Sequence, residues 1–177
     1  MNKIIPTDLD GVFELQPQVF SDHRGTLTKP FHAEEFSRLG LASDFQETFY
    51  SVSKKNVLRG MHFQLPPHDH EKLVFVANGE VLDVAVDIRK NSRTFGKSHA
   101  VVLSAQKGNS LYLSKGFAHG FLTLSRSAVV IYQTTTVHTP SHDSGIKWDS
   151  FGFEWQVKNP IISEKDSLLP GIFEHNI

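Results

Sequence analysis

The chain has 177 residues, of which 39% are hydrophobic and 21% charged, a length and composition typical of one globular domain with its own core. Lys and Arg total 18 against 19 Asp and Glu, and the pI is about 6.8, so the basic surface that nucleic-acid binding needs is not expected. The absence of cysteine excludes a disulfide framework and a thiolate zinc site, whereas ten histidines leave a histidine and carboxylate metal site open.

No targeting or membrane segment is evident in the sequence. Residues 1–8 lack the apolar core of a signal peptide, and no stretch approaches the roughly 18 apolar residues of a membrane-spanning helix. We therefore expect a cytoplasmic protein with neither a membrane nor a nucleic acid as partner. Repeats, low-complexity tracts and linkers are also absent, which predicts a single domain over residues 1–177.

The elements predicted along the chain favour an all-β fold of short strands packed face to face. Fourteen Phe residues, frequent Val and Thr, and closely spaced turn residues support this class. One short helix is predicted over residues 30–39, with Pro30 at its start and Gly40 at its end, and a second begins after Ser163. Further strands are predicted at residues 49–53, 57–65, 98–103, 110–113, 119–124 and 128–137.

Residues 72–89 carry the strongest local signal for a β-hairpin. Asn78-Gly79 separates two apolar runs and is typical of a two-residue type I′ turn. Pairing Ala77 with Glu80 divides the side chains between two faces, of which one is purely apolar. The other face carries Lys72, Val74, Val76, Val81, Asp83, Ala85 and Asp87. This mixed face fits a partly polar cavity inside a barrel or sandwich, or a solvated face with an ordinary ion pair.

A histidine lies on the polar side of an otherwise apolar predicted strand. Alternation places His62 on the face opposite Met61 and Phe63. Such a histidine serves either as a hydrogen-bonded structural residue or as an acid or base. A bulge at Gly60 would decide whether Arg59 points with His62 or away from it.

Other histidines suggest an alternative, a metal centre of the cupin type. The spacing over residues 108–120 resembles the second cupin motif and delivers His119 onto a strand. Metal-binding cupins add an upstream His-x-His pair, here His68 and His70, and a glutamate soon after it. Apolar residues occupy the glutamate position, so the ligand set lacks its carboxylate. A metal-dependent oxygenase is therefore the less favoured hypothesis.

Two further residues have both a structural and a functional interpretation. Tyr132, in a predicted strand, is most simply a core or interface residue with its hydroxyl at the edge. An unbroken strand would place His138 on the same face as Tyr132. Asp166 follows Ser163 at the spacing of a helix capping box, which favours a role in accepting a backbone N–H.

Seven motifs follow one another in continuous register between about Phe20 and Asp166. They are Arg59-Gly60-Met61-His62-Phe63-Gln64, Glu71-Lys72-Leu73-Val74, Gly79-Glu80-Val81, Asp83-Val84-Ala85-Val86-Asp87-Ile88-Arg89, Thr94-Phe95-Gly96-Lys97, Gly116-Phe117-Ala118-His119-Gly120-Phe121 and Ser163-Glu164-Lys165-Asp166. Together these motifs resemble the dTDP-4-dehydrorhamnose 3,5-epimerase family.

The resemblance implies a cupin-like jelly-roll β-sandwich, a homodimer, and an epimerase that needs no metal or other cofactor. Its substrate would be a 4-keto-6-deoxyhexose linked to a nucleotide diphosphate. By resemblance, His62 is the base that removes a proton beside the C4 ketone, and Asp166 stabilises its imidazolium. Lys72 matches the residue that stabilises the enolate, and Tyr132 the acid that returns a proton on the opposite face. Arg24 and Arg59 match positions that hold the diphosphate, and His119 and Asp83 match conserved positions around the site.

Several positions depart from the family where it contacts its substrate. Lys29 stands where the family has Glu, Glu47 and Phe49 replace Gln and Asn, and His138 replaces a second active-site Tyr. Because the proposed proton-transfer residues are intact, this pattern favours a retained mechanism on a changed substrate. Phe49 would add a stacking surface for the base or the sugar.

These departures from the family suggest alternatives for the nucleotide carrier and for the number of centres inverted. Lys29 exchanges a hydrogen-bond acceptor for a donor, which favours a CDP-linked sugar if the side chain reaches the base. His138 exchanges a phenol for an imidazole, which favours inversion at a single centre, C5 or C3. A non-catalytic sugar-nucleotide binding protein is a further, less favoured hypothesis.

Overall fold

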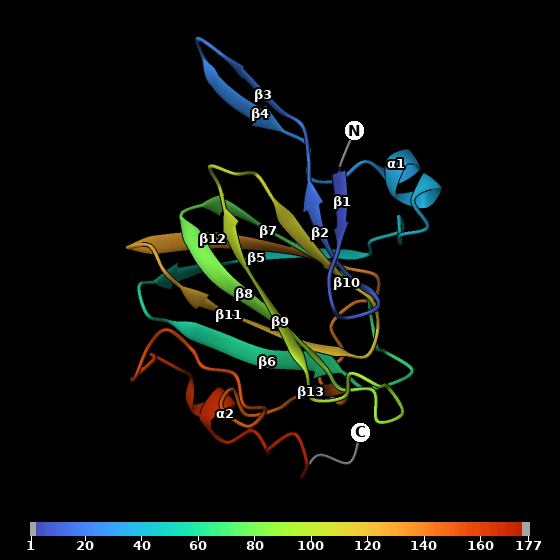
Figure 1. Cartoon of the computed structure of the whole chain (residues 1–177), viewed down its shortest axis with the longest axis vertical. Helices are drawn as coiled ribbons and strands as arrows, with labels where there is room; N and C mark the ends of the chain where they lie inside the picture. The colour runs from blue at the N-terminus through green and yellow to red at the C-terminus, as the bar shows by residue number, and fades with distance from the viewer. Residues whose placement is uncertain (1–2, 175–177) are drawn as a thin grey trace.

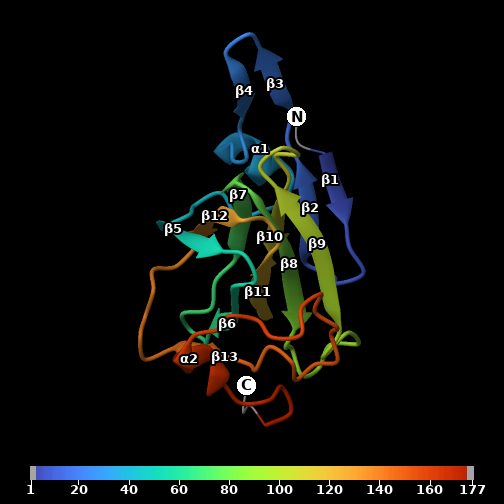
Figure 2. The same cartoon turned by 90° about the vertical axis from the view of Figure 1, so that its left-hand side faces the viewer.

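A computed structural model describes residues 3–174 of the chain. Two antiparallel sheets pack face to face as two layers, and a separate hairpin projects beyond them (Figures 1 and 2). Two short helices complete the fold. This architecture confirms the predicted all-β, jelly-roll type of sandwich.

The strands are distributed over the two sheets without regard to their order in the chain. The six-stranded sheet has the order β1 (Lys3–Pro6), β2 (Val12–Gln16), β10 (Ser110–Leu113), β7 (Lys72–Asn78), β12 (Ser127–Thr134) and β5 (Glu47–Lys54). The five-stranded sheet has the order β13 (Asp143–Gly145), β6 (Leu58–Gln64), β11 (Phe117–Thr123), β8 (Glu80–Asp87) and β9 (Ser98–Ser104). The remaining elements are the hairpin of β3 (Val19–Asp22) and β4 (Gly25–Thr28), and the helices α1 (Ala33–Arg38) and α2 (Glu164–Ser167).

Every strand predicted outside residues 72–89 forms, with ends shifted by a few residues, and so do both predicted helices. Helix α1 ends close to Gly40, whose φ of +73° is a conformation that glycine adopts without strain. Strands β1, β2, β3, β4 and β13 were not predicted. They are three to five residues long, too short for alternation to give a clear signal.

The predicted hairpin over residues 72–89 is wrong. β7 pairs with β10 and β12, whereas β8 pairs with β9 and β11 in the opposite sheet. A type I′ turn needs positive φ at both central residues, but among the described residues other than glycine only Asn56 has positive φ. Gly79, with a φ of +80°, instead marks the point where the chain crosses between sheets, and a Cβ there would lie 2.2 Å from the carbonyl oxygen of Ser127.

The predicted division of side chains between two faces nevertheless holds in each strand, because alternation does not depend on the strand's partner. Val74, Val76, Val81 and Ala85 lie in the core between the sheets. The side chains on the opposite faces of these strands belong to two outer cores. One lies under residues 146–172 on the five-stranded sheet, and the other lies under α1 on the six-stranded sheet.

Two charged side chains of the mixed face, Lys72 and Asp83, are buried between the sheets at 9% and 0% exposure. The alternative of a solvated face with an ordinary ion pair is therefore wrong, and the interpretation as a partly polar interior is confirmed. Asp87 is also buried, but it accepts hydrogen bonds from Arg89 at the end of β8. Neither helix described over residues 3–174 has the length and apolar character needed to span a membrane.

Candidate active site

A cavity of about 450 Å³ opens between the sheets. Its walls come from β5, β6, β7, β11 and β12, with further side chains from β13 and α2. Because these strands belong to both sheets, residues distant in sequence meet here. The lining residues that the sequence predicted are Glu47, Phe49, Arg59, His62, Lys72, His119, Tyr132 and His138.

A bulge in β6 turns both Arg59 and His62 toward this cavity. His119 of β11 lies opposite His62 and Phe121 lies opposite Arg59, so two residues of β6 face one residue of β11. Gly60, with a φ of +124°, forms the bulge, and a Cβ there would lie 2.6 Å from the Cα of Gly120. The structure thus answers the question that the sequence left open about Arg59.

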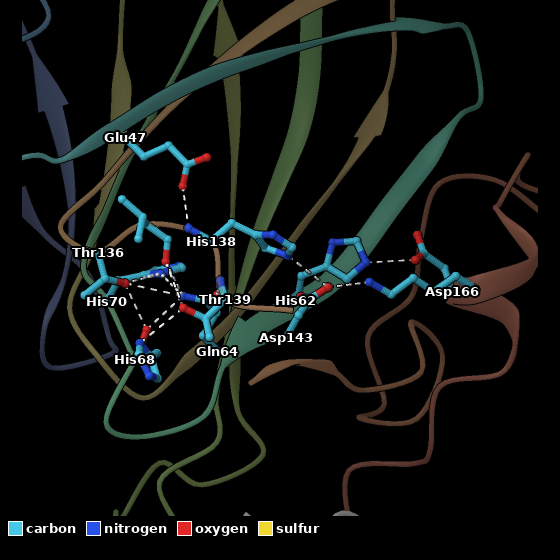
Figure 3. A network of polar contacts seen from close by, with 12 residues as sticks. Glu47, His62, Gln64, His68, His70, Thr136, His138, Thr139, Asp143 and Asp166 are labelled. Carbon is cyan, nitrogen blue, oxygen red and sulfur yellow. Dashed lines mark hydrogen bonds and ion pairs between the residues drawn. The ribbon is translucent and has the colours of Figure 1, made fainter. Parts of the chain in front are cut away.

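His62 is paired with a buried carboxylate behind it (Figure 3). Its Nε2 lies 2.8 Å from Oδ1 of Asp166, while Oδ2 accepts the backbone N–H of Gly60 at 3.2 Å. Burial by itself raises the pKa of Asp166, but the hydrogen bond and charge of His62, together with the hydrogen bonds from Gly60 and Ser163, outweigh it and hold the pKa below the usual value. Asp166 is therefore an anion at neutral pH.

The pairing fixes the tautomer of His62. A carboxylate only accepts hydrogen bonds, so Nε2 of His62 carries the hydrogen and Nδ1 of the neutral ring carries the lone pair. The capping interpretation of Asp166 is also part of the structure, since Ser163 accepts the Asp166 backbone N–H at 3.0 Å. The carboxylate itself, however, accepts from Gly60 and not from the helix.

Lys72 is a buried cation beside His62. Its Nζ donates to the backbone oxygen of His62 at 3.1 Å, and the side chain lines the cavity. Burial lowers the pKa of Lys72 to about 8, against the opposing charges of Asp143 and Asp83. Nζ has three N–H bonds, so it has hydrogens left for an oxygen atom in the cavity.

Tyr132 of β12 lines the same cavity from the six-stranded sheet, which also carries Lys72, whereas His62 belongs to the five-stranded sheet. Its hydroxyl is 3.2 Å from Oγ of Ser51, and its ring stacks on Phe49 with centroids 4.7 Å apart. Burial raises the pKa of Tyr132 above its ordinary value, and the hydrogen bond with Ser51 only partly opposes this. The phenol is therefore protonated at neutral pH.

A second histidine and carboxylate pair lies deeper, where His119 Nε2 is 2.9 and 3.0 Å from the two oxygens of Asp83. Both side chains are buried. The ring of His119 meets that of Tyr132 edge to face at 6.1 Å. On the neighbouring strand β6, Arg59 donates from Nε to Oγ of Ser53 at 3.0 Å.

His138 reaches the cavity although β12 ends at Thr134. Its backbone N–H donates to Oε2 of Glu47 at 2.6 Å, and its Nε2 lies 3.4 Å from Oδ2 of Asp143 (Figure 3). Asp143 also accepts from Lys165. Burial raises the pKa of Asp143, but Lys165 and His138 outweigh it and lower the pKa below its usual value.

Sequence reasoning did not identify Ser51, Asp143 or Lys165 as cavity residues. Lys165 precedes Asp166 in a quoted motif, so its neighbour could have pointed to it. Asp143 lies on a three-residue strand, where no periodicity shows which way a side chain points.

The geometry does not support a metal centre built from His68, His70 and His119. No three His, Asp or Glu side chains within residues 3–174 are grouped so that they could hold an ion. Gln64 contacts Nδ1 of His70 at 3.1 Å and donates to the backbone oxygen of His68 at 2.9 Å (Figure 3). Burial, with the charge of Lys72, lowers the pKa of His70 to about 3, so this histidine is a neutral part of the cavity wall.

Arg24 and Lys29 do not line the cavity of their own chain. Arg24 is at the turn of the projecting hairpin, with its side chain 79% exposed and paired with Asp22, and Lys29 directly follows β4. The structure therefore places two proposed substrate-binding residues on or directly after the β3–β4 hairpin, which projects away from the sandwich (Figure 2).

The profile of one protein family, dTDP-4-dehydrorhamnose 3,5-epimerase, matches residues 6–174. The chain belongs to this family. The dTDP-4-dehydrorhamnose 3,5-epimerase of Escherichia coli strain K12 is 44% identical over 170 residues, which cover 94% of this chain and 92% of that protein.

Solved structures of epimerases of this family share the fold. The crystal structure of dTDP-4-dehydrorhamnose 3,5-epimerase from Elizabethkingia anophelis matches with a TM-score of 0.93 and 36% identity, and covers 99% of both chains. The 3,5-epimerase of Legionella pneumophila in complex with dTDP-4-keto-L-rhamnose matches with a TM-score of 0.93 and 34% identity, covering 98% of this chain and 94% of that chain.

Proposed function

We propose that this chain epimerises a 4-keto-6-deoxyhexose carried on a nucleotide diphosphate, with dTDP-4-keto-6-deoxyglucose as its substrate. The observation that carries the proposal is the convergence of His62, Lys72 and Tyr132 on one cavity. Family membership and the dTDP-sugar complex of the Legionella relative support it. The family profile spans residues 6–174, and we propose that residues 1–177 act as one catalytic domain.

The chemistry requires a base and an acid on opposite sides of the sugar ring. The C4 ketone acidifies the hydrogens at C3 and C5. Nδ1 of His62 takes one of them as a proton, and the electron pair left behind passes to the C4 oxygen as an enolate. Lys72 donates to that oxygen and stabilises its charge. Tyr132 then gives its O–H proton to the same carbon from the other face, as the electron pair returns from the C4 oxygen and the ketone re-forms. The phenolate regains a proton from solvent, and the His62 imidazolium releases its proton to solvent.

The other predicted residues hold the substrate in this proposal. Arg59 is the cavity cation suited to the diphosphate, because its guanidinium offers several donors to phosphate oxygens. Glu47, His119 and His138 line the cavity and offer polar groups to the sugar or the nucleotide. No cofactor is required, because the substrate's own ketone acidifies the hydrogens.

The test uses heavy water and a panel of 4-keto-6-deoxyglucose linked to dTDP, CDP, UDP or GDP. We expect deuterium at C3 and C5 of the dTDP sugar, seen by NMR, together with conversion to the epimer. Deuterium at one carbon only would replace this proposal with the single-centre alternative. Faster exchange with the CDP sugar would show that CDP, and not dTDP, is the preferred carrier. Absence of exchange with every carrier would reject the proposal.

We also propose that the chain acts as a homodimer in which the hairpin of one copy completes the cavity of the other. Arg24 and Lys29 lie on or beside that hairpin, away from their own cavity. The hairpin exposes apolar side chains that a second copy would cover, and so does β5, the edge strand beside the cavity. They are Val19, Phe20 and Leu27 of the hairpin, and Tyr50 and Val52 of β5.

A mixed dimer of Arg24→Ala and His62→Ala tests this arrangement. If the hairpin serves the partner's cavity, one of the two sites in each mixed dimer has both residues intact. Two impaired variants, refolded together, should then regain about a quarter of the wild-type activity. Recovery of no activity, or a monomeric mass in solution, would contradict the proposal. Location in the cytoplasm stays a prediction from the sequence.

A further inference from the structure

Phe49 covers the phenol ring of Tyr132. The two residues lie directly opposite each other on β5 and β12. Their rings are nearly parallel, with an interplanar angle of 13° and centroids 4.7 Å apart. Phe49 is 44% exposed, whereas Tyr132 is only 8% exposed. One face of the Phe49 ring is therefore packed on Tyr132, rather than being offered to the base or the sugar as the sequence suggested.

Three other contacts fix the same phenol. His119 meets the ring edge to face at 6.1 Å, and Phe121 packs against it at 6.5 Å. The hydroxyl lies 3.2 Å from Oγ of Ser51. Of the aromatic neighbours, Phe49 is the exposed one, since His119 and Phe121 are buried. Phe49 can therefore be truncated while the buried neighbours of the phenol are kept.

Phe49 shields one face of the Tyr132 phenol in a cavity whose other walls carry charged side chains. Burial is the main cause that raises the pKa of Tyr132; the hydrogen bond with Ser51 and the charge of Arg59 oppose it, and the charge of Asp83 adds to it. The stacked ring of Phe49 covers one face of the phenol and is part of that burial. The titratable and charged groups around the phenol are Glu47 of β5, Arg59 and His62 of β6, Lys72 of β7, Asp83 of β8 and His119 of β11.

We propose that Phe49 is a positioning residue that determines how often removal of a proton ends in inversion. The inference rests on the proposed function. After His62 has taken a proton from carbon, the enolate has two fates. Tyr132 protonates it from the opposite face and inverts the centre, or the imidazolium of His62 returns a proton to the original face. In heavy water the second fate leaves deuterium on the sugar when the imidazolium has exchanged its N–H with solvent before it returns the proton. Phe49 favours the first fate because it holds the Tyr132 hydroxyl in place and keeps it protonated.

The experiment compares Phe49→Ala with wild type in heavy water, using dTDP-4-keto-6-deoxyglucose. NMR separates deuterated epimer, which reports inversion, from deuterated substrate of the original configuration, which reports return. We expect the ratio of inversion to return to fall about three- to tenfold in Phe49→Ala, the range of one aromatic pair. The fall should steepen above about pH 9, because the newly hydrated phenol then ionises at lower pH.

Two variants separate positioning from a general loss of structure. Phe49→Tyr keeps the stacked ring and should restore the ratio. Thr48→Ala changes the neighbouring exposed residue of β5 and should leave it unchanged. A readout independent of substrate is the phenolate absorbance, which should show a lower pKa for Tyr132 in Phe49→Ala, with Tyr132→Phe as the reference that identifies its signal.

The outcomes distinguish this inference from the proposed function. If wild type shows no exchange at all, the proposed function fails, and the phenolate titration still tests whether Phe49 shields Tyr132. If wild type exchanges but Phe49→Ala keeps the ratio and the titration unchanged, Phe49 does not position the acid. A fall in ratio that Phe49→Tyr fails to restore would equally overturn the inference.

Discussion

His62→Ala is expected to reduce solvent deuterium incorporation into dTDP-4-keto-6-deoxyglucose by about 10²- to 10⁴-fold, the usual contribution of a positioned general base. In the proposed mechanism the imidazole accepts the proton, because Asp166 Oδ1, 2.8 Å from Nε2, takes the Nε2 hydrogen and leaves the lone pair on Nδ1. Without it, neither return nor inversion can begin, so both deuterated products should disappear together.

His32→Ala is the matched control for this prediction. His32 is the exposed N-cap of α1, and its side chain makes no capping hydrogen bond. Its removal should leave exchange unchanged. Exchange that persists at the wild-type rate in His62→Ala would show that another group removes the proton, and the role of His62 would have to be abandoned.

Lys72→Met is expected to lower the exchange rate by about 10²- to 10³-fold, the effect of deleting one donor to a developing oxyanion. Methionine fills most of the buried space of the lysine but offers no donor. The substitution therefore removes the enolate's partner while His62 and Asp166 stay in place. Lys158→Met, at an exposed site, should have no such effect.

The pH dependence gives a second check on Lys72. Its pKa is lowered by burial to about 8, so the cation is complete well below pH 8 and is lost as the pH rises through that value. The wild-type exchange rate should fall along an alkaline limb near pH 8. A rate that is flat to pH 10, or the same limb in Lys72→Met, would contradict the assignment.

Alternation within a strand predicted correctly which side chains point inward. Lys72 and Asp83 were placed on one mixed face and are both buried between the sheets. The partner of each strand was not predictable in the same way. Asn78-Gly79 has the composition of a tight turn, but Asn78 lacks the required positive φ, and the chain crosses to the other sheet. Long-range pairing, not local propensity, decided the outcome.

In the candidate site, too, the residue types could be predicted from the sequence, but their arrangement depends on long-range structure. His62 and Tyr132 could be found as polar residues in apolar strands and from the family resemblance. That Arg59 shares the cavity with His62 depends on a bulge at Gly60, which the sequence suggested but could not establish. Asp143 comes from a short strand without periodicity, and its place opposite His138 is set by tertiary structure.

The most direct test of the two-sided mechanism is the product distribution of Tyr132→Phe in heavy water. Phenylalanine keeps the ring that packs between Phe49 and His119 but removes the acid. We expect deuterium to enter substrate of the original configuration, through His62, while formation of the epimer falls by at least about 10²-fold. Epimer formed by Tyr132→Phe at the wild-type rate would contradict the assignment of base and acid to opposite faces of the sugar.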